Sequence, residues 1–325
     1  MSLLAAYGHH QNSAVDVLSD ALNFQEMKMK KEPLLLIVGG VALAFFVALT
    51  VNPAFFHTVY KSGWQTLRKW QALWASSDFG DPLPVTPLAL RLSPLDGAPL
   101  VFIPTGEFEL GTNEAAYAKS QPAHRVYVDA FWMDQMEVSN AQYARCALAG
   151  ACTPPLNGDY PNRYLDSTYA NHPITYVVWS QAIAYCAWAG RRLPTEAEWE
   201  RAARGEDGRL YPWGDTPPDI FRLNYNDNIG DTTPVDRYPF GASPYGVLNM
   251  AGNVREWVSD WFNQGYYLHS PYENPGGAQN AENKVLRGSS FTDDAYQSVA
   301  FNRYEHYPMS PGENRGFRCV EEDTK

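Results

Sequence analysis

The sequence predicts a domain that mixes short helices and strands with long loops, preceded by one membrane-spanning helix. Three observations favour this organisation. Residues 33–52 form an uncharged, mostly apolar run that reaches the roughly 20 residues a bilayer-spanning helix needs. Residues 95–325 contain three short segments with helix caps and two segments rich in β-branched and aromatic residues. Between residues 205 and 245, Gly, Pro, Asn and Asp dominate, which indicates ordered loops.

Residues 1–32 are polar and of mixed charge, and we expect them to be loose unless a partner orders them. The span follows, with no charged residue from Pro33 until Lys61. A cleaved signal peptide is the alternative, but its apolar region is usually shorter, about 7–15 residues, and starts nearer the N-terminus. We therefore predict a retained single-pass anchor.

Positive charges flank the predicted span unequally. Three lysines crowd residues 28–31 on its N-terminal side, whereas Lys61, Arg68 and Lys69 lie more loosely on the other side. Because cytoplasmic flanks carry the excess of Lys and Arg, the N-terminus is predicted to be cytoplasmic. The large domain is then expected on the extracytoplasmic side of the cell membrane.

Residues 53–94 are predicted to form a juxtamembrane helix and a proline-rich linker. Trp64, Trp70 and Trp74 recur among cations, as in a helix that lies in the membrane interface. The same tryptophans fit an interface with a neighbouring subunit equally well. The segment from Asp81 to Pro87 then indicates a stiff linker that holds the domain off the membrane.

Helix caps mark three short helices inside the domain, and β-branched and aromatic residues mark two strands. The predicted helices are residues 140–149 after Ser139, residues 181–189 after Ser180, and the segment begun by the capping box of Thr195 and Glu198. The predicted strands are residues 125–129 and 131–133.

The formal net charge of −11 is concentrated in the domain. The first 80 residues hold six Lys and Arg against five Asp and Glu, which leaves 19 against 31 for the remainder. Binding of nucleic acid needs clustered cations against the phosphates, so this class of partner is excluded. A soluble extracytoplasmic domain tolerates such an acidic exterior.

Residues 245–262 gather oxygen ligands without a helical or strand period. Asn249 and Glu256 supply side-chain oxygens, and the turn between them can aim the carbonyls of Gly252 and Val254 at the same point. Four oxygens from one loop suit calcium, which takes six to eight oxygen ligands in forgiving geometry. The alternative is a tight turn capped by Asn and Glu, with the tryptophans of the segment filling core.

A second loop, residues 224–235, concentrates five oxygen-bearing side chains before a Thr-Thr-Pro turn. This composition again suits a hard cation. The alternative is an Asn- and Asp-rich turn that holds itself together by hydrogen bonds between side chains and backbone.

Four cysteines are few for a domain of this size. Cys146 and Cys152 flank a predicted helix end, and either a disulfide or two free buried thiols fits that placement. No CxxC pair or His/Cys cluster indicates zinc. The scattered histidines have no nearby Ser or Cys in a triad signature, so nucleophilic hydrolysis has no support.

Several motifs follow one another in a fixed order. They are Val101-Phe-Ile-Pro-Thr-Gly-Glu-Phe108, the run from Arg192 to Arg204, Tyr211-Pro-Trp-Gly214, residues 245–262, Arg287-Gly-Ser-Ser-Phe291 and Gly316-Phe-Arg-Cys-Val320. Together they resemble the formylglycine-generating-enzyme, or sulfatase-modifying-factor, family from about residue 100 to about residue 320. The resemblance implies one large α+β domain of the C-type-lectin-like sort, with little regular secondary structure and many ordered loops.

One departure from that family concerns its chemistry. Active members oxidise a substrate cysteine to formylglycine with two cysteines five residues apart, whose thiolates hold copper, and the corresponding positions here are Asp293 and Ser298. Neither a carboxylate nor a hydroxyl replaces a soft thiolate for Cu(I) or for thiol exchange. We therefore expect no formylglycine chemistry and no copper. With Asp294 and Arg303, these residues are expected to line the remaining cleft, as a ligand site or as a neutralised structural cluster.

The resemblance also implies two calcium sites and a disulfide. At the second loop the implied ligands are Asn224, the carbonyl of Tyr225, Asp227 and the carbonyl of Ile229. The family's paired cysteines correspond to Cys186 and Cys319. Disulfides persist mainly outside the cytoplasm, which agrees with the predicted orientation.

The expected function is that of a catalytically inactive, calcium-stabilised accessory or structural subunit of a larger membrane protein complex. One alternative is an enzyme of altered chemistry, oxidising sulfur or modifying an amino acid in the same cleft. Another is an extracytoplasmic ligand-binding module. An open cleft at Asp293, Ser298 and Arg303 with strongly shifted carboxylates would favour the enzyme, and a filled cleft would not.

Overall fold

The computed structural model describes residues 85–156 and 163–323. The predicted tail, membrane span and juxtamembrane helix all precede residue 85, so they lie outside the described residues. Within the two described ranges, no helix has both the length and the apolar character needed to cross a bilayer.

The described strands are short and form three small sheets. The strands are β1 Leu90–Leu92, β2 Pro99–Ile103, β3 Gly106–Leu110, β4 His124–Val128, β5 Phe131–Asp134, β6 Arg255–Trp261, β7 Lys284–Arg287, β8 Tyr304–His306, β9 Arg315–Gly316 and β10 Val320–Glu322. One sheet has the antiparallel order β1-β2-β5-β10, and β3 pairs with β4. The third has the order β8-β7-β6-β9, in which β6 and β9 are parallel.

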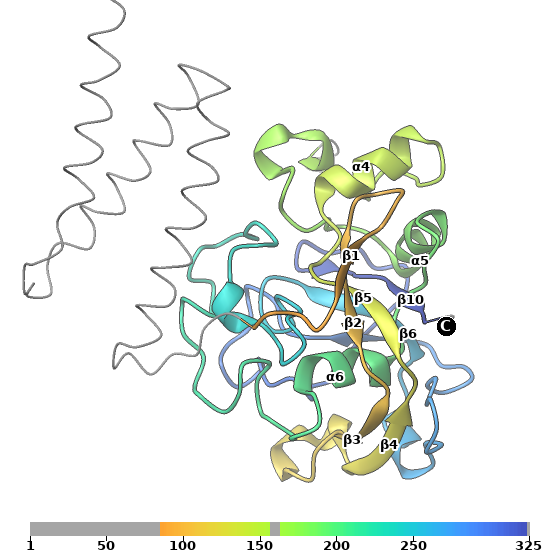
Figure 1. Cartoon of the computed structure of the whole chain (residues 1–325), viewed down its shortest axis with the longest axis vertical. Coiled ribbons are helices and arrows are strands. Elements are labelled where there is room, and N and C mark those ends of the chain that lie inside the picture. The colour runs from red at the N-terminus through yellow and green to blue at the C-terminus, as the bar shows by residue number, and fades with distance from the viewer. Residues whose placement is uncertain (1–84, 157–162, 324–325) are drawn as a thin grey trace, which may run out of the picture. The chain divides into compact units, whose positions relative to one another are not determined.

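Three α-helices and several single 3-10 turns complete the described part. The helices are α4 Asn140–Leu148, α5 Trp179–Trp188 and α6 Glu196–Arg204, and the turns are η1 Ala115–Ser120, η2 Arg163–Leu165, η3 Ser167–Tyr169, η4 Pro239–Gly241 and η5 Tyr266–Leu268. Figure 1 shows α4 and α5 at one end, the β3–β4 hairpin at the other, and α6 between them. The mixed fold with little regular structure agrees with the sequence-based expectation.

The predicted caps of α4 and α6 are confirmed. The hydroxyl of Ser139 accepts a hydrogen bond from the Gln142 amide, and Thr195 accepts one from Glu198, whose carboxylate in turn accepts from the Thr195 amide. The start of α5 was predicted wrongly, because the helix begins at Trp179 and not after Ser180. The side chain of Gln181 reaches back to accept from the amide that precedes the helix, so no Ser or Thr cap is needed.

Both predicted strands form, with limits that differ by one residue. They are β4 and β5. Between residues 205 and 245 the single regular element among the described residues is the turn η4, as the Gly- and Pro-rich composition predicts.

The helix α6 is buried along its whole length. Its apolar side chains pack in one core cluster with residues of the strands β2 to β7, and these side chains are Trp199, Ala202 and Ala203. Two of its three glutamates, Glu196 and Glu200, bind the buried Arg287. Removing one partner of such a buried pair typically costs about 3–5 kcal/mol, because the other charge is left without compensation in the core.

Two disulfides join the described cysteines in the predicted pairs. Cys186 of α5 bonds to Cys319, which directly precedes β10, and Cys146 of α4 bonds to Cys152. The first disulfide spans 133 residues of sequence and therefore fixes the C-terminal strand to the middle of the chain.

Candidate functional site

Asp293 is the first of the two residues that the sequence comparison above predicts at the positions of the family's cysteines. Its carboxylate pairs with the guanidinium of Arg255, with Nε at 2.9 Å, and accepts from the amide and the hydroxyl of Ser290 at 2.8 Å each. The residue is only 3% exposed. Asp293 therefore closes the turn after β7 and has no free face toward solvent.

Ser298, the second of these two residues, is equally enclosed. Its hydroxyl donates to the carbonyl of Asp294 at 2.8 Å and accepts from the hydroxyl of Ser289 at 3.0 Å. It is 1% exposed. The hydroxyl thus both donates and accepts, and neither of these partners among the described residues is a base that could activate it as a nucleophile.

The two remaining residues of the predicted cleft, Arg303 and Asp294, lie in different surroundings. Arg303 is buried and binds both carboxylate oxygens of Glu196, and it also donates to the carbonyl of Lys119. Asp294 is exposed and accepts from the amide of Gln297. Arg303 thus serves the charge network of α6 rather than a site shared with Asp293.

In the first predicted calcium loop, the side-chain nitrogen of Asn249 donates two hydrogen bonds. Asn249 has a left-handed backbone, with φ of 55°, and its Nδ2 donates to Glu137 Oε2 and to the carbonyl of Val235, both at 2.8 Å. The Oδ1 atom of the same side chain is buried and has no hydrogen-bond partner among the described residues. Leaving a buried acceptor unsatisfied costs about 1–3 kcal/mol, so this oxygen calls for a partner.

Glu256, the second residue of β6, is already engaged. Its carboxylate accepts from Arg318 through two nitrogens at 2.7 Å each and from the indole of Trp199 at 2.8 Å. Gly252 and Val254 are also buried between Asn249 and Glu256. An ion here would share the carboxylate with Arg318.

The second predicted loop repeats the arrangement at its first residue. Asn224 Nδ2 donates to the carbonyl of Asp231 at 2.8 Å, and within the part of the chain that the structure describes its buried Oδ1 has no hydrogen-bond partner. Tyr225 is half-buried, while Asp227 and Ile229 are exposed. Asp227 also has a left-handed backbone, and its backbone amide donates to the carbonyl oxygen of Phe291 at 2.7 Å.

The donor set of both loops fits calcium. Each loop has one buried amide oxygen without a hydrogen-bond partner among the described residues, and its sequence also contains a carboxylate and backbone carbonyls, the hard oxygens that calcium prefers. In the described ranges, His, Cys, Asp and Glu side chains do not gather in threes around a metal-sized space. Amide and carbonyl oxygens would therefore supply most of the ligands, which calcium accepts and softer metals do not.

Sequence reasoning missed two residues of this region, Glu137 and Asn253. Asn253 stands between two predicted carbonyl ligands, and its Nδ2 donates to Glu137 Oε1 at 2.9 Å. Glu137 lies 116 residues away in the sequence. The signal that could have found it is a lone carboxylate between Met136 and Val138, immediately before a helix cap.

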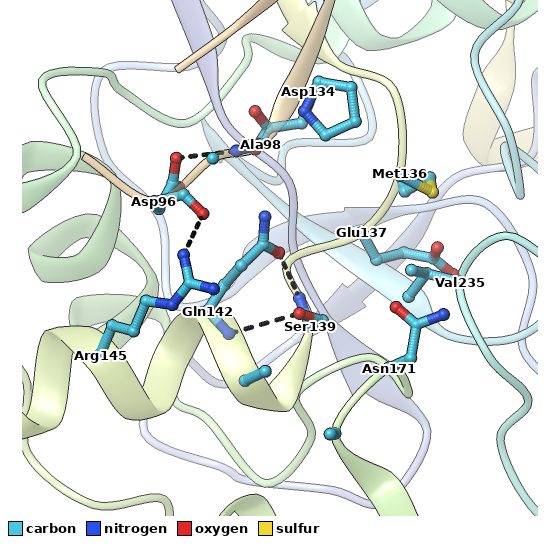
Figure 2. A pocket seen from close by; sticks show the side chains of 14 residues that line it. Asp96, Ala98, Asp134, Met136, Glu137, Ser139, Gln142, Arg145, Asn171 and Val235 are labelled. Atoms are coloured by element: carbon cyan, nitrogen blue, oxygen red, sulfur yellow. Dashed lines mark hydrogen bonds between the residues drawn. The ribbon is translucent and has the colours of Figure 1, made fainter. Parts of the chain in front are cut away.

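A cavity of about 400 Å³ lies beside Glu137, between the ends of β2 and β5 and the start of α4. Figure 2 shows Asp96 and Arg145 on one side of it and Glu137, Asn171 and Val235 on the other. None of the residues proposed for the family cleft lines this cavity. The concave site is thus separate from Asp293 and Ser298.

Two carboxylates in the cavity wall have raised pKa values. Burial raises the pKa of Asp134 to about 6, although Arg191 opposes the shift. Burial raises the pKa of Glu137 to about 7, and the charge of Glu256 adds to the rise while Arg318 opposes it. Both groups already accept hydrogen bonds from the protein, Asp134 from Arg191 and the Cys319 amide.

Comparison with known proteins agrees with the motifs and the fold. The family model of the sulfatase-modifying factor enzyme 1-like domain matches residues 92–323. Formylglycine-generating enzyme of Mus musculus is 32% identical over 285 residues, covering 70% of this chain and 76% of the mouse protein.

Two further relatives extend the comparison. Hercynine oxygenase of Mycolicibacterium smegmatis is 30% identical over 229 residues, covering 59% of this chain and 54% of that protein. The solved structure of PvdO from Pseudomonas aeruginosa superposes with a TM-score of 0.62 at 24% identity, over 73% of this chain and 99% of the PvdO chain. The second likeness concerns the fold alone.

Proposed function

The chain belongs to the family of sulfatase-modifying factor enzyme 1-like domains, and from this premise we propose that it is a catalytically inactive, calcium-stabilised member. Its role is that of an accessory subunit of a membrane protein complex, with the domain on the extracytoplasmic side. The observation that carries the proposal is that Asp293 and Ser298 are buried and already bound to other groups of the protein.

Asp293 and Ser298 are built into the protein rather than held ready for a substrate. The Asp293 carboxylate is neutralised by Arg255, and the Ser298 hydroxyl is hydrogen-bonded on both sides. Formylglycine formation with a copper-bound thiolate pair needs soft, exchangeable sulfur ligands at these positions. A buried ion pair and a saturated hydroxyl offer neither.

The first experiment tests inactivity. The purified full chain, kept in mild detergent and supplied with copper, is incubated with a cysteine-containing sulfatase peptide, and the peptide mass is followed. The Mus musculus enzyme serves as the positive control. We expect no conversion and no bound copper by elemental analysis, and turnover of the peptide by this chain would refute the proposal.

Calcium is proposed as the stabilising cofactor at the two asparagine loops. The ligands are Asn249 and Glu256 with the carbonyls of Gly252 and Val254 at one loop, and Asn224 and Asp227 with the carbonyls of Tyr225 and Ile229 at the other. An ion at each loop would be the partner of the buried Oδ1 atom of that loop, Asn249 in one and Asn224 in the other.

Melting with and without chelator tests this cofactor. An ion that binds only the folded loops, at a hundredfold excess over its dissociation constant, stabilises by about 2.7 kcal/mol. We expect the melting temperature of the full chain to fall on chelation and to recover with calcium. An unchanged melting curve and no metal by elemental analysis would remove both sites.

The accessory role rests on the predicted anchor, the tryptophan-rich segment after it and the absence of the family's cysteines from the site. The tagged full chain is cross-linked in intact membranes, and a matched form in which residues 53–79 are replaced by a polar linker serves as control. A stoichiometric partner lost from the control supports the role. A chain that stays monomeric in both forms contradicts it.

A second candidate is an enzyme of altered chemistry, which the relative named hercynine oxygenase favours. The cavity beside Glu137 would provide its substrate site, and a ligand-binding module would use the same space. Dioxygen uptake by the purified chain in the presence of hercynine would favour the enzyme. A thermal shift with hercynine but no uptake would favour the module.

A further inference from the structure

The two asparagine loops are in direct contact through their backbones. The amide of Asn253 donates to the carbonyl of Asn224 at 2.9 Å. Beside this bond, a Cβ atom added to Gly252 would stand 2.5 Å from the same carbonyl oxygen, and the glycine has φ of +81°. Only glycine permits so close an approach, so the contact between the loops depends on Gly252.

The side chain of Asn253 forms a second connection. Its Oδ1 accepts from the Thr233 amide at 2.8 Å and from Asn224 Nδ2 at 3.4 Å, and its Nδ2 donates to Glu137 Oε1. Asn253 is fully buried and has φ of 62°. One amide group therefore contacts the Asn224 loop with its oxygen and Glu137 with its nitrogen.

Glu137 completes the connection to the other loop. Its Oε1 accepts from Asn253, and its Oε2 accepts from Asn249 Nδ2 at 2.8 Å. Because the amide nitrogen of Asn249 is held here, its oxygen must face the opposite way, toward the position without a partner. The orientation of Asn224 is fixed in the same manner, by Asn253 and Asp231.

We propose that Glu137 and Asn253 couple the two cation sites, so that an ion bound at one loop raises the affinity of the other. The inference rests on the calcium binding proposed above. An ion at Asn224 orders the amide of Asn253, which holds Glu137 in place, and Glu137 orients the Asn249 oxygen. Binding of the first ion thus includes the free-energy cost of ordering these side chains, and binding of the second ion does not.

The test uses a ligand that is exposed and therefore safe to remove. Asp227→Ala should abolish the Asn224 site without disturbing the core, because no hydrogen bond to its carboxylate is present among the described residues. The full chain is stripped with chelator and titrated with calcium by calorimetry. Coupling energies between sites correspond to about 5–150-fold in affinity, so we expect the remaining site to weaken at least about fivefold.

Terbium luminescence excited through tryptophan identifies the remaining site, since Trp199 donates directly to the proposed ligand Glu256. Asp236→Ala is the matched control, because this exposed aspartate binds only the Asn171 side chain among the described residues. It should leave both affinities unchanged.

A double-mutant cycle then assigns the coupling to the bridge. In an Asn253→Ala background, Asp227→Ala should no longer affect the Asn249 site. If that background fails to fold, Glu137→Gln replaces it, because glutamine keeps the volume and offers one acceptor in place of two.

The outcomes separate the two proposals. If the wild-type chain binds no ion, calcium binding itself is wrong. If it binds two ions and Asp227→Ala leaves the affinity of the other site unchanged, calcium binding stands and the coupling is wrong.

Discussion

The carboxylate of Glu256 accepts three hydrogen bonds inside the core, two of them from Arg318. Glu256→Gln leaves the buried guanidinium of Arg318 without its counter-charge. The free energy of unfolding should therefore fall by about 3–5 kcal/mol even in chelator, where calcium plays no part. Urea denaturation with chelator present measures this change.

Glu273→Gln provides the matched control, because Glu273 is exposed. A surface substitution of this kind usually changes stability by less than about 0.5 kcal/mol. Equal effects of the two substitutions would show that the Glu256–Arg318 pair contributes nothing to the fold.

Asp260 provides a prediction about pH. Burial, reinforced by the charge of Glu196, raises the pKa of this carboxyl to about 7 from the ordinary 3.8. The folded state thus holds the proton more tightly than the unfolded state. Its contribution to stability is fully present below about pH 4 and is lost as the pH rises through about 7.

Asp260→Asn should remove this part of the pH dependence. We expect the stability of the variant relative to the wild type to rise between about pH 4 and pH 7, by an amount on the order of a few kcal/mol. Denaturation at a series of pH values checks this, with the exposed Asp236→Asn as control. Parallel curves for Asp260→Asn and the wild type would contradict it.

Single residues also show where sequence reasoning ends. Asn249 could be proposed as a ligand from the sequence because it belongs to a local loop with glycine and glutamate at suitable spacing. Glu137 was not, because its partner Asn249 lies 112 residues further along the chain. Likewise, nothing in the sequence near Asp293 indicates that Arg255 will pair with it.

At the scale of elements, local signals predicted α4 and α6, since a cap and its partner lie within four residues. The predicted start of α5 was wrong because the hydrogen bond that caps the helix is accepted by Gln181, and glutamine has many other roles in helices. The strands β6 to β10 were not predicted. Their pairing depends on distant partners, as in the contact of β10 with β5.

The two disulfides should differ in their effect on stability. In the chain-entropy model a closed loop of 133 residues stabilises by roughly 4–5 kcal/mol, and one of six residues by roughly 2 kcal/mol. Cys186→Ala/Cys319→Ala should therefore lower the free energy of unfolding more than Cys146→Ala/Cys152→Ala. Urea denaturation of both double variants compares them, and a larger loss from the short loop would contradict the prediction.

At the scale of the whole molecule, the family and the mixed fold followed from ordered motifs over most of the chain. The internal charge network did not, because composition reports only an excess of acid. Arg287, Arg303 and Arg318 are fully buried and bind glutamates within the domain. The glutamates that bind them are buried as well, so this network is close to neutral and the excess of acid stays with the rest of the domain.

The predicted topology has a direct test. Protease added to intact spheroplasts should remove the domain and leave about the first 30 residues protected, because the lysine cluster before the predicted span sets its orientation. An antibody against residues 1–32 and another against the domain follow the fragments. Complete protection of the domain would reverse the topology.

The pairing of β10 with β5 bears on how the protein is made. The strand that completes the first sheet, the cysteine that bonds to α5 and the arginine that holds Glu256 all lie between residues 318 and 322. While a ribosome is still adding residues before this point, the emerging domain lacks the last member of each of these contacts. The chain can therefore complete these contacts only after synthesis has passed residue 322, so a nascent chain up to that point has no closed first sheet.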